Sequence, residues 1–191
     1  MKQLNAHDFE DMYKDLGVDL DELGCIMLDV DGSKIKPIQG MEKHLYTAKD
    51  PKKFWIKGFV AEKNPHVTLL YGLMKPGKEW KDHVDTLLRS WDLASVKIAE
   101  VGYFESNIPG EDYYCIVAHL DITPELLEGH RRLQLLPHID TFVGKYKAHI
   151  TIAYVKKDEE IRDEIISKYN DMLQEEELKI TGINYGEKTE S

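Results

Sequence analysis

Several features that would mark a membrane, secreted or metal-binding protein are scarce or missing in this sequence. Its 191 residues include two cysteines, Cys25 and Cys115, both in apolar stretches. No apolar run approaches the ~20 residues of a membrane helix, and the opening "MKQLNAHDFEDMYKDLG" lacks the apolar segment of a signal peptide. We therefore expect a cytoplasmic protein with no membrane association. We also expect buried, reduced cysteines, although the sequence alone leaves a disulfide open.

Positive charge is scarce as well, since 35 acidic residues outweigh 25 basic ones and give a net charge of −10. Long RNA or DNA binds through many contacts between cations and phosphates, so this chain is a poor general binder of long nucleic acid. A small phosphate ligand needs only one local basic pocket. No low-complexity segment or linker is evident, so we expect one domain spanning residues 1–191.

The spacing of apolar residues predicts an N-terminal helix in residues 1–22 and then a strand in "GCIMLDVDG" that ends in an Asp-Gly turn. From the strand "HVTLLYG" onward, the predicted order is strand, helix, hairpin, helix, strand, helix, strand. The helix beginning "TPELLEG" has Thr123 as its N-cap and Pro124 at its first position. The segment 33–51 is irregular and is expected to be a long loop, followed by a strand in "KFWIKGFVA". These elements predict an α+β fold.

One short strand pattern occurs twice, as "PHVTLLYG" at 65–72 and "AHITIAYV" at 148–155. Alternate residues of a strand share a face, so His66 and Thr68 point one way, as do His149 and Thr151. In a regular strand Tyr71 and Tyr154 lie on the opposite, buried face, unless the strand bends after the threonine. If the two halves of the chain pack side by side, both histidines and both threonines line one cleft.

This set of side chains suits phosphodiester chemistry. A neutral histidine accepts a proton from an attacking hydroxyl, and a protonated histidine donates one to the leaving oxygen, which predicts His66 and His149 as the catalytic pair. Thr68 and Thr151 can donate hydrogen bonds to the phosphoryl oxygens, and Lys147, on the same expected face, adds positive charge. No metal or cofactor is required.

Two plainer interpretations compete with this one. A single His-x-Thr in a strand is usually a half-buried packing pattern, but two copies at matching positions favour a shared function. A metal site with two histidines is less consistent with the sequence, because no HExxH motif and no acid at the second or third following position completes it.

The paired motifs, His66-Val67-Thr68-Leu69 and His149-Ile150-Thr151-Ile152, resemble the signature of the 2H phosphoesterase superfamily. This resemblance implies a bilobal α+β fold, with two pseudo-symmetric lobes, each with an antiparallel-rich β-sheet and covering helices, around a central cleft. It also implies metal-independent action on phosphodiesters, with the histidines as acid and base and the threonines binding phosphate.

Within the superfamily, "LGCIMLDVD" and "PHVTLLYGL" look most similar to the phage branch that degrades the cyclic oligonucleotide messengers of CBASS immunity. The expected partner is then a small cyclic oligonucleotide. The alternatives are an RNA 2′,3′-cyclic or 2′-5′ phosphodiesterase, a 2′-5′ ligase-like protein, and a non-catalytic sponge for cyclic nucleotides.

Other aromatic and histidine residues receive plainer predictions. Six aromatic residues near strand ends are candidates for stacking on bases, but core packing explains each of them better. They are Trp55, Tyr103, Phe104, Tyr113, Tyr114 and Tyr185. Three histidines on expected helices are assigned to the surface: His7, His83 and His130. No motif surrounds His44, His119 or His138.

Overall fold

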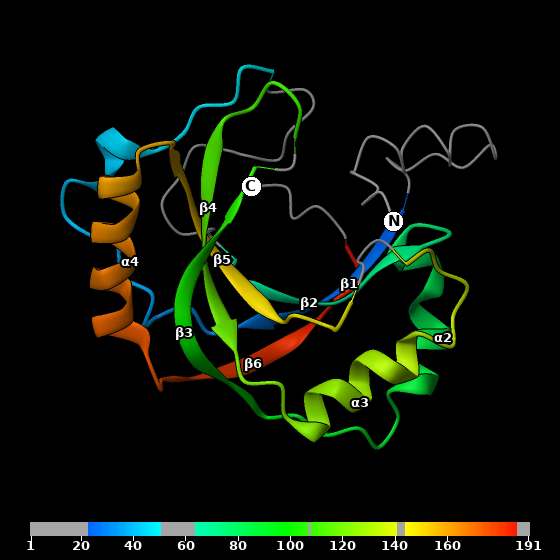
Figure 1. Ribbon diagram of the computed structural model, residues 1–191. Helices are drawn as coiled ribbons and strands as arrows, with labels where there is room; N and C mark the ends of the chain where they lie inside the picture. The colour runs from blue at the N-terminus through cyan, green and yellow to red at the C-terminus, as the bar shows by residue number, and fades with distance from the viewer. Residues whose placement is uncertain (1–22, 51–63, 107, 141–143, 187–191) are drawn as a thin grey trace.

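The computed structural model describes residues 23–50, 64–106, 108–140 and 144–186. These residues form six strands and three α-helices, drawn in Figure 1, together with two short 3-10 helices. The strands are β1 (Gly24–Val30), β2 (His66–Leu73), β3 (Ser95–Glu105), β4 (Tyr113–Leu120), β5 (His149–Lys156) and β6 (Glu177–Asn184). The helices are η2 (Met41–His44), η3 (Gly77–Trp80), α2 (Lys81–Leu87), α3 (Pro124–Leu133) and α4 (Glu159–Leu173).

The predicted order of elements is confirmed for the described part of the chain, and the capping residues explain where two helices begin. The Thr123 side chain accepts a hydrogen bond from the Leu126 N–H at 3.2 Å, and Asp158 caps α4 in the same way through Ile161 N–H. Within the predicted loop 33–51, residues 33–50 are described, and they include the short 3-10 helix η2 between irregular stretches. The predicted N-terminal helix at 1–22 and the strand in "KFWIKGFVA" lie outside the described residues.

All strand pairs are antiparallel, and they close in the order β1-β2-β5-β4-β3-β6. The prediction of an α+β fold with antiparallel strands is confirmed. Each motif strand is followed by a helix and a strand, as the sequence predicts. The two halves do not form separate sheets, however, because β2 pairs with β5 at Val67 and Ile150 and joins them into one ring.

The main hydrophobic core lies on one face of the motif strands. Val67 and Ile150 are fully buried in it, together with residues from all three α-helices. Helix α4 packs on β3 and β4, whereas α3 packs on β2 and against α2, so the helices cover the two halves separately (Figure 1). The other face of β4 carries a second, smaller cluster around Tyr46, Tyr113 and Val117.

Both cysteines are free, as expected; Cys115 is buried and Cys25 is half-buried. Among the described helices, none is both long and apolar enough to cross a membrane.

Candidate active site

The register between β2 and β5 gathers the four predicted motif residues. Val67 pairs with Ile150, and both side chains point into the core. In an antiparallel pair, the residues on either side of this position face the opposite way, so His66 lies across from Thr151. By the same register, Thr68 lies across from His149. Side chains directly opposite each other have Cβ atoms about 4.5–5.5 Å apart, so the four residues form one compact group.

Both motif histidines are held in the same way. His66 Nδ1 lies 3.1 Å from the carbonyl oxygen of Asn64, and His149 Nδ1 lies 3.0 Å from that of Lys147. Because a carbonyl oxygen only accepts, each Nδ1 carries the proton of its hydrogen bond. Nε2 is therefore the nitrogen that gains or loses a proton in each ring, and each ring can serve as either base or acid.

Each motif strand contains a β-bulge directly after its threonine. On β2, Thr68 pairs with Met27 and Leu70 with Ile26, which leaves Leu69 as an extra residue. On β5, Thr151 pairs with Val117 and Ala153 with Ile116, so an extra residue occupies the equivalent position. A bulge puts two successive side chains toward one face and shifts the alternation that follows.

The bulges overturn the prediction that Tyr71 belongs to the core, and they place Tyr154 against the smaller cluster around Tyr46, Tyr113 and Val117 instead of in the main core. Both tyrosines turn onto the face that carries the histidines, because the extra residue reverses the alternation. Tyr71 is 36% exposed, and Tyr154 is partly exposed with its ring edge-on to Tyr113 at a centroid distance of 5.2 Å. The sequence does contain a signal: "TLLY" and "TIAY" put two apolar residues in succession where strict alternation would put one.

The first bulge is clamped by side chains from outside the strand. The Tyr146 hydroxyl donates to the carbonyl oxygen of Thr68 at 2.8 Å, and His130 Nδ1 donates to that of Leu69 at 2.7 Å. The two rings stack on each other at 4.1 Å and 6°. The assignment of His130 to the surface is therefore wrong, since α3 turns this side chain inward to a backbone carbonyl.

His149 has a third histidine beside it that the sequence did not single out. His119 on β4 pairs with His149 across the strands, and the Phe104 ring lies edge-on to both, at 5.4 Å and 5.0 Å respectively. Burial lowers the pKa of His149, the hydrogen bond to the Lys147 carbonyl opposes this, and the nearby His119 and His66 lower it further. His149 is therefore held toward its neutral form.

The neighbours of the first motif are different. His66 pairs with Asp29 on β1, and the Asp29 carboxylate accepts a hydrogen bond from Asn184 at 3.3 Å. Burial raises the pKa of the Cys25 thiol to about 11, and the nearby Thr68 side chain opposes this with a smaller effect. Cys25 is thus a neutral partner for Thr68, not a thiolate nucleophile.

Lys147 lies at the entrance to β5 and is exposed, two residues before His149. Its charge contributes to a lowered pKa of His119, after burial and against the opposing effect of Glu100. The lysine is thus placed near the histidine group, and its contact with phosphate stays a prediction.

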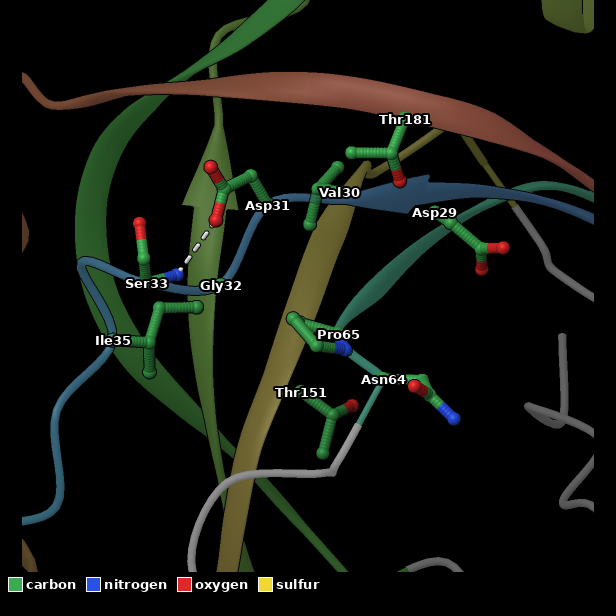
Figure 2. A pocket seen from close by; sticks show the side chains of 10 residues that line it. All are labelled: Asp29, Val30, Asp31, Gly32, Ser33, Ile35, Asn64, Pro65, Thr151 and Thr181. Carbon is green, nitrogen blue, oxygen red and sulfur yellow. Dashed lines mark hydrogen bonds between the residues drawn. The ribbon is translucent and has the colours of Figure 1, made fainter. Parts of the chain in front are cut away.

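A pocket of about 540 Å³ opens beside Thr151. Figure 2 shows Thr151 near Asn64 and Pro65, which lead into His66, with Asp29 and Asp31 on the β1 side. The Ser33 N–H donates to Asp31, which lowers the pKa of that carboxyl and keeps it ionised. The pocket lining comprises Asp29, Val30, Asp31, Gly32, Ser33, Ile35, Asn64, Pro65, Thr151 and Thr181. In the described ranges, no group of three or more His, Cys, Asp or Glu side chains is arranged to hold a metal ion.

Comparison with known proteins gives one family match. The model of the 2′-5′ RNA ligase superfamily matches residues 33–189, which include both motifs. Two structures of Usb1 from Kluyveromyces marxianus are similar, one of them with uridine monophosphate. The first is 14% identical, with a TM-score of 0.43 over 79% of this chain and 81% of that one. The second is 12% identical, with a TM-score of 0.42 over 80% and 82%. No curated protein matches the sequence.

Proposed function

The chain belongs to the 2′-5′ RNA ligase superfamily, and from this premise we propose that it is a phosphodiesterase whose acid and base are His66 and His149. The expected 2H phosphoesterase superfamily is thereby confirmed, and the family suggests phosphoesterase activity. The single observation that carries the proposal is that both histidines, on adjacent strands, make the same hydrogen bond. Nδ1 of His66 donates to the Asn64 carbonyl oxygen, and Nδ1 of His149 donates to that of Lys147. Each histidine lies across from the threonine of the other motif.

The proposed first step is an attack by a ribose 2′-hydroxyl on the neighbouring 3′-5′ phosphate. The 2′-oxygen loses its proton to His149 Nε2 and forms a bond to phosphorus. The bond from phosphorus to the 5′-oxygen breaks, and His66 Nε2 donates a proton to that leaving oxygen. A 2′,3′-cyclic phosphate remains, and water opens it in a second step with the two histidines exchanging roles.

The environment of His149 supports this assignment of roles. Its lowered pKa keeps Nε2 unprotonated near neutral pH, and a base must start unprotonated. His66, at the equivalent position, is then the acid. Thr68 and Thr151 donate to the non-bridging oxygens, where negative charge develops, and Lys147 adds a positive charge at one end. None of these steps uses a metal ion.

We propose a small cyclic oligonucleotide as the substrate. The net charge of −10 and the acidic groups Asp29 and Asp31 beside the pocket disfavour a long phosphate backbone but leave room for a compact ligand. The biological role that follows is the removal of CBASS messengers by a phage protein in the host cytoplasm.

The second candidate is an RNA 2′,3′-cyclic or 2′-5′ phosphodiesterase or a 2′-5′ ligase-like protein, and the description of the matching family favours it. A sponge that binds without cleaving fits less well, because such a protein has no use for two histidines held by equivalent hydrogen bonds from Nδ1.

The test is incubation of the purified protein with cyclic di- and trinucleotides, RNA ending in a 2′,3′-cyclic phosphate, and 2′-5′-linked dinucleotides, each with and without EDTA. Mass analysis identifies the products. We expect linearised cyclic oligonucleotides, with a 2′,3′-cyclic phosphate intermediate. Cleavage of the RNA ends alone would favour the second candidate. Complete loss of activity in EDTA would overturn the metal-free mechanism.

A further inference from the structure

The two relocated tyrosines extend the local two-fold symmetry of the site. The site centres on the Val67–Ile150 pair, and each bulge brings a tyrosine to the same position after its threonine. Each tyrosine Cα is three strand steps of about 3.3 Å from this centre once the extra residue is discounted, which is about 10 Å. Because the strands are antiparallel, Tyr71 and Tyr154 lie at opposite ends.

A linkage between two nucleosides has a similar layout, with a phosphate in the middle and a base on each side. We propose that Tyr71 and Tyr154 are stacking surfaces for the two bases flanking the scissile phosphate, and that they select internucleotide linkages over substrates carrying one nucleoside. This inference rests on the proposed phosphodiesterase function and adds its specificity determinants.

The surroundings of the two tyrosines fit this role. Tyr71 keeps 36% of its surface exposed although it follows a run of buried aliphatic residues. Tyr154 packs against the smaller cluster with its ring edge-on to Tyr113, which fixes the ring while part of its surface stays exposed. Stacking on aromatic rings tolerates any base, because every base has a π-face. An aromatic ring at both ends therefore selects for the number of nucleosides and leaves base identity to other groups.

The experiment measures binding with ligands that lack the 2′-hydroxyl, so that the proposed reaction cannot consume them. The ligands are 2′-deoxyadenylyl-(3′→5′)-2′-deoxyadenosine, with two bases, and the methyl ester of 2′-deoxyadenosine 3′-phosphate, with one. We expect Tyr71→Leu and Tyr154→Leu each to weaken binding of the two-base ligand about 5- to 100-fold. Only one of the two variants should weaken binding of the one-base ligand.

Matched controls separate stacking from other roles. Tyr71→Phe and Tyr154→Phe keep the ring and should bind within about twofold of the unmodified protein. Tyr103→Leu removes an equally exposed tyrosine, at 38%, from the face covered by α4, and should have no effect. If the phenylalanine variants lose as much affinity as the leucine variants, the hydroxyls bind phosphate and the inference is wrong. If both leucine variants weaken the one-base ligand as much as the two-base ligand, the inference is wrong too.

The two proposals fail in different ways. If the unmodified protein cleaves ribonucleotide substrates but the leucine variants bind both deoxy ligands normally, the function stands and the stacking inference falls. If two-base selectivity is present but no ribonucleotide is cleaved, the tyrosines act as inferred and the catalytic proposal falls.

Discussion

The two motif strands are alike in sequence and backbone but differ in what surrounds them. In both, a histidine donates from Nδ1 to the carbonyl two residues earlier, and a bulge follows the threonine. Around β2, however, His66 faces the carboxylate Asp29, whereas on β5 His149 faces a second imidazole, His119. The shared backbone gives both histidines the same local geometry, and the differing neighbours support the proposed division of roles between them.

The two bulges are also held differently. Side chains from α3 and from the segment before β5 clamp the first, through His130 and Tyr146. Beside the second, the backbone N–H of Tyr46 donates to the Tyr154 carbonyl at 3.0 Å. A side-chain clamp can be removed by a single substitution, whereas a backbone bond cannot, so the first half is the easier one to test.

The largest effect should come from the histidines themselves. We expect His66→Ala and His149→Ala each to lower the rate constant about 10²- to 10⁴-fold, because each removes one proton transfer from the transition state. The measurement is single-turnover cleavage of the best substrate. His83→Ala, an exposed histidine on α2, is the matched control and should retain full activity. Near-normal turnover in His66→Ala would refute its role as acid.

The threonines should give smaller losses, and unequal ones. Thr151 opens onto the pocket, whereas Thr68 lies beside the neutral Cys25 thiol, which can compete for its hydroxyl. A hydrogen bond to a charged group contributes about 1.5–3 kcal/mol, so Thr151→Ala should lower kcat/KM about 10- to 100-fold and Thr68→Ala less. Serine at either position keeps the hydroxyl and should recover most of the activity. Equal losses would show that Cys25 does not compete with the phosphate.

The strand and helix order and the four motif residues were accessible from sequence because they depend on local periodicity. Strand alternation alone placed His66 with Thr68 and His149 with Thr151, and the register then confirmed that the two pairs meet. Capping by Thr123 was equally local. Periodicity describes one helix or strand at a time, and that information is sufficient to predict the element order, the shared faces of the motif residues and the cap.

The rest of the site depends on contacts between elements. His119 and Phe104 approach His149 only through the pairing of β4 with its neighbours. His130 is one polar residue on a helix until α3 packs on β2. A bulge adds a single residue to a strand, yet the two bulges turn Tyr71 and Tyr154 onto the face that carries the motif histidines.

Removing the clamp on the first bulge should have a moderate effect. Tyr146→Phe leaves the Thr68 carbonyl without its donor, so we expect about 1 kcal/mol lower unfolding free energy and about a threefold to tenfold lower kcat. Tyr169→Phe is the control: this buried tyrosine on α4 bonds weakly to Met41, so any loss should be of stability alone. Denaturant unfolding and saturated turnover are measured for both. Full kcat in Tyr146→Phe would make the clamp purely structural.

The smallest effect should be a displacement of the pH–rate profile. If His149 is the base, activity rises with pH as Nε2 loses its proton, which gives the acidic limb of the pH–rate profile. Because the pKa of His149 is lowered, this limb should lie at a lower pH than for an ordinary histidine. The groups facing His149 are His66 from β2, His119 from β4 and the Phe104 ring from β3, with Lys147 just before β5 in the chain. His119→Gln removes one charge that opposes protonation, so the limb should move to higher pH while the plateau rate stays similar. The kcat/KM profile against pH measures this, with His83→Gln as the control. An unmoved limb would mean that a group other than His149 titrates there, and the acid and base would have to exchange places.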